Sequence, residues 1–136
     1  MKKMLFLFAF AFVSFYSFSQ SLQKGSLVGL HTDIVKLNGK TTMDQFTDFA
    51  AKKWAPAFAS ACGCEVRILK YVRGEGADKF SYMFIFKNEA GRDKFFKADG
   101  KLSDFGTSVF AKTKPVADEL AKLGTMKGVF TDWLVQ

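Results

Sequence analysis

The chain has 136 residues, of which 49% are hydrophobic and 24% are charged, and its net charge is +7 at pH 7. This composition is typical of a folded chain about one domain long, and it excludes a disordered polyelectrolyte. Two prolines and 11 glycines exclude collagen-like and proline-rich chains. The basic residues are scattered among the acidic ones, so no basic stripe is present and no nucleic-acid partner is expected.

Residues 1–19 have the pattern of a secretory signal. Lys2-Lys3 gives a positive start, the run from Met4 to Val13 is apolar, and Ser17-Phe18-Ser19 offers the small residues that a signal peptidase reads. We expect cleavage before residue 20, which makes the protein secreted or periplasmic. The alternative is an uncleaved anchor, although the apolar run is short for a membrane span. After cleavage, residues 20–136 form one domain with no membrane contact.

Residues 26–37 alternate in hydropathy and predict the first strand. Val28, Leu30 and Ile34 share one parity, whereas His31 and Asp33 share the other. If the apolar set faces the helices, His31 and Asp33 point to the opposite face of the sheet. Asn38-Gly39-Lys40 then predicts a turn.

A helix is expected to begin after Thr42, because Gln45 stands three residues later and completes a capping box. Aromatic and small residues from Phe46 to Phe58 recur at spacings of three and four, which predicts an amphipathic helix that covers a sheet. Pro56 removes a backbone donor, so a bend or break is expected near Ala55.

Two further strands are expected at Glu65 to Arg73 and Phe80 to Lys87, joined by a loop over residues 74–78. The second of these strands is apolar on both parities, which is typical of a central strand buried on both faces. Its second face therefore needs cover, from a partner subunit or from a ligand.

The remaining elements are two helices and a strand. Asn88 is expected to cap a helix through Ala98, and Pro115 to lie in the first turn of a later helix that ends before Gly124. Residues 129–135, which include Trp133, predict the last strand.

The expected order is β-α-β-β-α-β, which indicates an α+β protein of the ferredoxin-like type. Right-handed crossovers place the helices on one face of a four-stranded antiparallel sheet. In its element order, element lengths and the helix end Lys53-Trp54-Ala55-Pro56, the chain resembles the dimeric α/β-barrel superfamily. The resemblance implies a homodimer in which two sheets pack through their helix-free faces.

That superfamily includes cofactor-independent monooxygenases, haem-degrading enzymes, muconolactone-type isomerases and stress proteins. Its haem-degrading members use an asparagine on the first strand and a histidine on the second helical region. Here Asn38 lies beyond the strand, and residues 88–124 contain no histidine. Neither haem nor any other cofactor is therefore expected.

His31 is the only histidine of the chain, which excludes a site built from several histidines. With Asp33, Arg67, Tyr71 and Trp133 it is expected to outline a pocket on the face opposite the helices. Such a pocket, apolar with a few polar groups, predicts binding of a small, largely apolar ligand.

Other interpretations of these residues stay open. His31 is a candidate proton acceptor for a cofactor-independent monooxygenase or isomerase. In a non-catalytic structural or interaction domain, His31 and Asp33 would form a buried polar pair at a subunit interface. Arg67 would then pair with Glu65 or Asp132.

Cys62-Gly63-Cys64 contains both cysteines of the chain. An even count in an exported protein favours a disulfide between Cys62 and Cys64, which would clip the turn into the following strand. A redox or soft-metal site and unpaired or intermolecular thiols are the alternatives. Two thiolates are too few for a zinc site, and no metal is expected.

Overall fold

A computed structural model of the protein describes residues 22–74, 76 and 79–136. The predicted signal segment lies outside the described residues, so its cleavage stays a prediction. Within the described part of the chain, no helix combines the length and the apolar character that a membrane span requires.

Four strands form one antiparallel sheet in the order β2-β3-β1-β4. The strands are β1 (Leu27–Leu37), β2 (Glu65–Leu69), β3 (Lys79–Phe86) and β4 (Gly124–Leu134). β1 lies at the centre and pairs along its whole length with β4, from Leu27↔Leu134 to Leu37↔Gly124. This order confirms the predicted ferredoxin-like sheet.

The first helical region runs from α1 (Met43–Phe49) through the π-helical turn η1 (Ala50–Trp54) into α2 (Ala55–Cys62). The predicted capping box is present, because the Gln45 amide donates to Thr42 Oγ1 at 3.2 Å and the Thr42 amide donates to Gln45 Oε1 at 2.9 Å. The irregularity expected before Pro56 takes the form of the π-helical turn, which widens the backbone just ahead of the proline ring.

The second helical region is also divided, but its bounds differ from those predicted. α3 (Glu89–Asp93) has the expected Asn88 cap and ends well before Ala98. α4 (Asp104–Leu123) is a single 20-residue helix capped by Ser103, so Pro115 lies in its interior and not in a first turn. Both Pro115 and Ala111, whose carbonyl loses its partner, are exposed. Water can therefore satisfy that carbonyl, and the helix continues.

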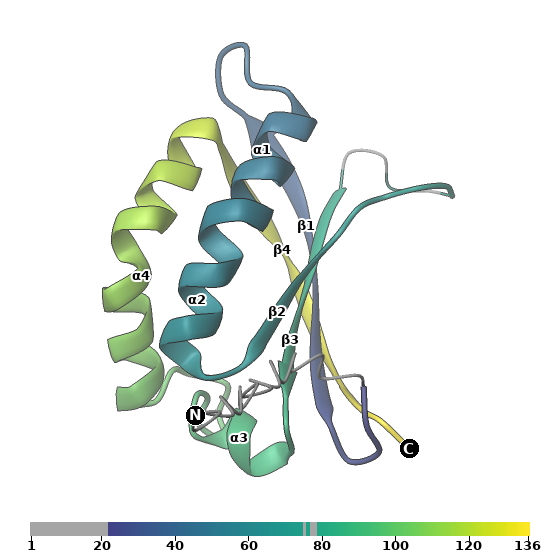
Figure 1. Cartoon of the computed structure of the whole chain (residues 1–136), viewed down its shortest axis with the longest axis vertical. Coiled ribbons are helices and arrows are strands. Elements are labelled where there is room, and N and C mark those ends of the chain that lie inside the picture. The colour runs from purple at the N-terminus through teal and green to yellow at the C-terminus, as the bar shows by residue number, and fades with distance from the viewer. Residues whose placement is uncertain (1–21, 75, 77–78) are drawn as a thin grey trace, which may run out of the picture.

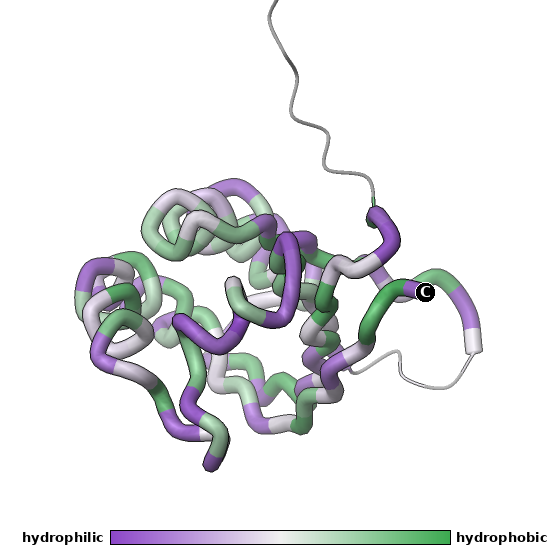
Figure 2. The backbone as a smooth tube through the Cα atoms, turned by 90° about the horizontal axis from the view of Figure 1, so that it is seen from below, coloured by the Kyte–Doolittle hydropathy of each residue, from purple (hydrophilic) through white to green (hydrophobic). Residues whose placement is uncertain are grey.

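The two long helical segments lie on the same side of the sheet (Figure 1) and stand next to each other when the molecule is viewed from below (Figure 2). The core between these layers is mostly aromatic and draws on the first helical region, α4 and the sheet. Its buried members are Leu27, Phe46, Ala50, Trp54, Ala55, Phe58, Phe80, Tyr82, Phe84, Phe86, Phe95, Val109 and Leu120.

The helix-covered face of β1 is the one opposite to our prediction. Leu27, Val35 and Leu37 pack with the core, so His31 and Asp33, which share their parity, also face the helices. The deciding contacts come from β3, whose aromatic side chains all lie on this face and stand opposite the odd-numbered residues of β1. Because β1 is apolar on both parities, its own alternation could not identify the covered face.

The other face of the sheet is called the open face. It carries the even-numbered residues of β1 and the odd-numbered residues of β4, since directly paired residues point to the same side. Ile34, Val129 and Trp133 are exposed there, at 59%, 72% and 59% of their surface. β4 begins at Gly124, five residues before the predicted start, because pairing with β1 orders a glycine-containing segment with little strand propensity of its own.

Candidate functional site

His31 lies in a row of aromatic rings that crosses three strands. Its direct partners are Tyr82 on β3 and Phe130 on β4. The imidazole stacks on Tyr82 with centroids 4.5 Å apart and planes 10° apart, and on Phe130 at 5.5 Å and 24°. Phe84 adds an edge contact at 5.1 Å. The register of the sheet therefore holds the only histidine between two rings.

An ion pair lies beside this row. Arg92, from α3, donates from Nε to Asp132 Oδ2 on β4 at 3.0 Å, and its guanidinium carbon lies 5.2 Å from the centroid of the Phe96 ring. A Cβ atom at Gly29 would lie 3.2 Å from Asp132 Oδ1 and 3.9 Å from His31 Nε2. Because Gly29 has no side chain, the Asp132 carboxylate and the His31 imidazole both lie close to the β1 backbone at this position.

Asp33 stands two residues along β1 from His31 and is buried. A Cβ atom at Gly128 would overlap the Asp33 carboxylate and the Thr32 carbonyl oxygen, so a larger residue has no place opposite Asp33. We call the following six residues the His31 cluster: His31, Asp33, Tyr82, Arg92, Phe130 and Asp132.

Burial disfavours the charged form of three groups in the His31 cluster. It lowers the pKa of His31, an effect that the negative charge of Asp132 partly opposes. Burial raises the pKa of the Asp33 carboxyl. Burial, with a further contribution from the charge of Asp33, raises the pKa of Tyr82. The site therefore combines a largely apolar setting with several convergent groups whose pKa values are shifted, as functional sites often do.

The chemistry available to this arrangement follows from the state of His31. A neutral imidazole can accept a proton or a hydrogen bond at neutral pH. Phe130 is half-exposed and offers an aromatic surface next to it. Within the described residues, no group of three or more His, Cys, Asp or Glu side chains is placed to hold a metal ion.

The five residues that the sequence assigned to one pocket lie in different places. His31 and Asp33 are on the helix-covered face, whereas Arg67 and Trp133 are on the open face, where Arg67 pairs with Glu65. The strand that was expected to carry Tyr71 ends at Leu69. The predicted anchors therefore lie on two different faces of the sheet. The prediction placed them together because one wrong assignment of parity in β1 puts every side chain of that strand on the wrong face.

Tyr71 lines a separate hollow on the open face, beyond the end of β2. This pocket has a volume of about 260 Å³ and is also lined by Thr32, Ser81, Lys70 and Lys79. Ser81 donates from its hydroxyl to Thr32 Oγ1 at 3.3 Å across β3 and β1. Neither Arg67 nor Trp133 contributes to it.

Four members of the His31 cluster were not predicted from the sequence as site residues. Tyr82 and Phe130 are on predicted strands, and their alternation would have identified them once the parity of β1 was known. Asp132 was considered only as a partner for Arg67. Arg92 had no local signal, because α3 brings it to β4 from 40 residues away in the sequence.

Cys62 and Cys64 are joined in a disulfide, with their Cα atoms 5.3 Å apart. The bond lies at the end of α2, where the chain turns into β2, and both residues pack against the edge of the core. This separation is within the range that a disulfide requires.

Comparisons with known proteins address the fold only. No family model and no curated protein matches the chain. A variant of SnoaB, a cofactor-independent oxygenase from Streptomyces nogalater, is similar at a TM-score of 0.48 and 14% identity, over 79% of this chain and 91% of SnoaB. A conserved protein of unknown function from Bacteroides thetaiotaomicron, described as a possible oxidoreductase, is similar at a TM-score of 0.48 and 15% identity. This similarity covers 80% of this chain and 99% of that protein.

Proposed function

We propose that this protein binds a small, planar, largely apolar molecule against the His31 cluster, on the helix-covered face of its sheet. The observation that carries the proposal is the position of His31, half-buried between two aromatic rings with a pKa lowered by burial. The proposed ligand is of the class expected for the pocket predicted from sequence, but it lies on the other face of the sheet.

Aromatic contacts supply the affinity in this proposal. Phe130 is half-exposed and stacks on Phe96 at 6.4 Å and 13°, so the row of rings reaches the surface. A planar ligand that extends this row would bury apolar surface and gain ring contacts, each worth about 0.5–1.5 kcal/mol beyond the buried area.

Polar groups supply the orientation. Arg92 donates from Nε to Asp132 and has a second ion pair with Asp93 at 3.7 Å, and Asp132 Oδ1 and His31 Nε2 both lie next to Gly29. A hydroxyl or carbonyl oxygen on the edge of the ligand would meet these groups. We therefore expect hydroxylated aromatic compounds and quinones to bind better than plain hydrocarbons.

A second candidate function is proton transfer by His31, in a cofactor-independent oxygenation or isomerisation. It is favoured by the lowered pKa of His31, which keeps the imidazole available as a base at neutral pH. Phenolic protons and C–H groups flanked by carbonyls are the substrates that such a base suits.

We further propose that the protein is exported and acts as a homodimer. The open face exposes Ile34, Val129 and Trp133, and a second copy packed on this face would remove these side chains from water. In the dimer the two His31 clusters would lie on the outer sides of the paired sheets, each complete within its own subunit.

The binding proposal is tested by tryptophan fluorescence with naphthoquinone as the probe. Trp54 and Trp133 are the two tryptophans of the chain, and Trp54 lies 5.1 Å from Tyr82, on the helix-covered side. In a Trp133→Phe background, saturable quenching of Trp54 is expected. Adding Phe130→Ala or His31→Ala should weaken binding by up to about tenfold, because a ring contact is lost.

Arg67→Ala in the same background is the matched control, because Arg67 lies on the open face. Its binding curve should be unchanged. Quenching that is insensitive to both Phe130→Ala and His31→Ala, or that disappears in Arg67→Ala, would contradict the proposed location. Oxygen uptake with dihydroxynaphthalene tests the second function separately: uptake that His31→Ala abolishes supports it, and no uptake refutes it for this substrate class.

A further inference from the structure

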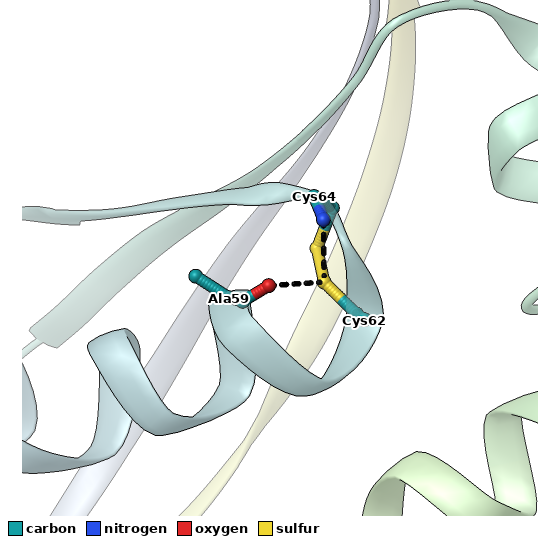
Figure 3. The surroundings of a disulfide bond; sticks show 3 residues. All are labelled: Ala59, Cys62 and Cys64. Atoms are coloured by element: carbon teal, nitrogen blue, oxygen red, sulfur yellow. Dashed lines mark hydrogen bonds between the residues drawn. A yellow bond between two sulfur atoms is a disulfide. The ribbon is translucent and has the colours of Figure 1, made fainter. Parts of the chain in front are cut away.

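The turn that contains the disulfide is built without the help of the sulfur–sulfur bond. Gly63 caps α2 in the left-handed region, with φ of 64°, and its amide donates to the Ala59 carbonyl at 3.0 Å. This helix-ending turn is a common device of the backbone itself. It brings Cys62 and Cys64 together, as Figure 3 shows, so the two sulfur atoms are expected to stay adjacent when the bond is open.

The disulfide adds little to the fold. A cross-link stabilises a protein by restricting the unfolded chain, and this effect is smallest when the closed loop is short. Here one residue separates the two cysteines. The elements on either side have anchors of their own, since Ala55 and Phe58 of α2 are buried and β2 pairs with β3 from Glu65 onward. Reduction should therefore leave the structure intact.

The turn that carries the bond is open on its outer side. Gly63 is exposed, and no atom lies within 4 Å of the position that its Cβ would take, so the outer side of the turn is open. Cys62 and Cys64 are half-buried, and they are the only cysteines of the chain. Exchange at this turn is therefore confined to this pair.

We infer that Cys62-Gly63-Cys64 is a thiol–disulfide exchange site that oxidises small thiols. The incoming thiolate attacks Cys64 Sγ and forms a mixed disulfide, while the bond to Cys62 breaks and its electron pair stays on Cys62 Sγ. This sulfur accepts the Cys64 amide proton in a hydrogen bond of 3.0 Å, which stabilises the departing thiolate. In the disulfide form Cys62 Sγ lies 3.8 Å from the Ala59 carbonyl oxygen, which can accept a hydrogen bond from the Cys62 thiol once that sulfur has taken a proton from water.

A second thiolate completes the exchange by attacking the sulfur of the bound small thiol. The mixed disulfide breaks, the small disulfide leaves, and Cys64 is released as a thiolate that takes up a proton. Two small thiols are then oxidised by two electrons, and the protein disulfide is reduced to a dithiol. The same steps in reverse, with a small disulfide as the oxidant, regenerate the starting state.

The inference is tested by equilibrating the native protein with mixtures of reduced and oxidised glutathione. Thiols are trapped with N-ethylmaleimide and counted by intact mass. We expect a reversible passage between disulfide and dithiol without denaturant, and a Tm of the dithiol form lower by at most about 7 °C. A disulfide that opens only when the chain is unfolded, or a dithiol form that lacks a cooperative transition, would overturn the inference.

A single substitution tests whether Cys64 can be the attacked sulfur. In Cys62→Ser the resolving thiol is missing, so a mixed disulfide between Cys64 and glutathione should accumulate while the protein is folded, whereas the natural chain should hold little of it. Ser60→Ala, an exposed neighbour that leaves both thiols in place, should behave as the natural chain. If the folded Cys62→Ser protein forms no mixed disulfide, Cys64 is not the attacked sulfur and the proposed sequence of steps is wrong.

Discussion

At the scale of single residues, His31 illustrates how neighbours decide what a side chain can do. A histidine side chain can act as a base at neutral pH, but the pKa of His31 depends on the surrounding rings and charges. Burial between Tyr82 and Phe130 lowers that pKa, and Asp132 limits the shift. The residue is therefore held as a neutral imidazole by contacts from two other strands.

This shift makes the free energy of unfolding depend on pH. Because the folded-state pKa of His31 is below the value of 6.5 for the unfolded chain, the unfolded chain binds the proton first on acidification. The contribution of His31 to the free energy of unfolding is complete above pH 6.5 and is lost as the pH falls through the folded-state pKa. Urea unfolding between about pH 8 and about pH 5 should therefore show a stability loss that is smaller in His31→Gln.

Asp33 provides an internal contrast in the same titration. Its pKa is raised by burial, so the folded chain takes up this proton before the unfolded chain does, and acidification below that raised pKa favours the folded state. If the free energy of unfolding varied with pH in the same way for the natural chain and for His31→Gln, His31 would not be buried as described.

At the scale of elements, the two prolines show that the same residue acts differently in two helices. Pro56 follows a π-helical turn, at the second position of α2, and so lies where a helix tolerates proline. Pro115 lies inside α4, where it removes one backbone hydrogen bond of the helix and leaves the exposed Ala111 carbonyl to water.

Replacing Pro115 by alanine should therefore stabilise the protein. The change restores an amide donor for the Ala111 carbonyl and removes ring crowding, for a gain of about 1–2 kcal/mol. The measurement is the Tm and the urea midpoint. Lys112→Ala, at an exposed position of the same helix, is the control and should stay within about 0.5 kcal/mol of the natural chain. A lower Tm for Pro115→Ala would mean that α4 needs the proline for its packing.

At the scale of the whole molecule, the sheet has two faces with different environments. Helices cover one face with an aromatic core, whereas the open face carries exposed Ile34, Val129 and Trp133. A layered α+β fold is complete when each apolar face has a partner layer. The second copy proposed here would supply that layer.

Sedimentation equilibrium tests this arrangement. The natural chain should have twice the mass of a single chain, and the double substitution Val129→Lys with Trp133→Lys should give single chains, because charges in an apolar interface lose their water. Lys112→Glu on the exposed side of α4 is the control and should leave the mass unchanged. A natural chain that sediments as a single copy at high concentration would contradict the proposal.

The order and type of the main elements could be predicted from sequence because their signals are local. The Thr42 capping box, the aromatic spacing of the first helical region and the alternation in β1 each depend on residues a few positions apart. The first half of β4 and the full length of α4 could not be predicted from the sequence, because their local signals are weak. Pairing with β1 stabilises the first half of β4, and packing against the core stabilises α4.

The amino-acid sequence by itself determined the ferredoxin-like order of this protein and its single histidine, because periodicity, caps and composition are properties of neighbouring residues. The tertiary structure decided which face His31 points to and which residues surround it. Strand register and the aromatic side chains of β3 set that face, and the contacts among Tyr82, Phe130, Asp132 and Arg92 join parts of the chain that are far apart in sequence.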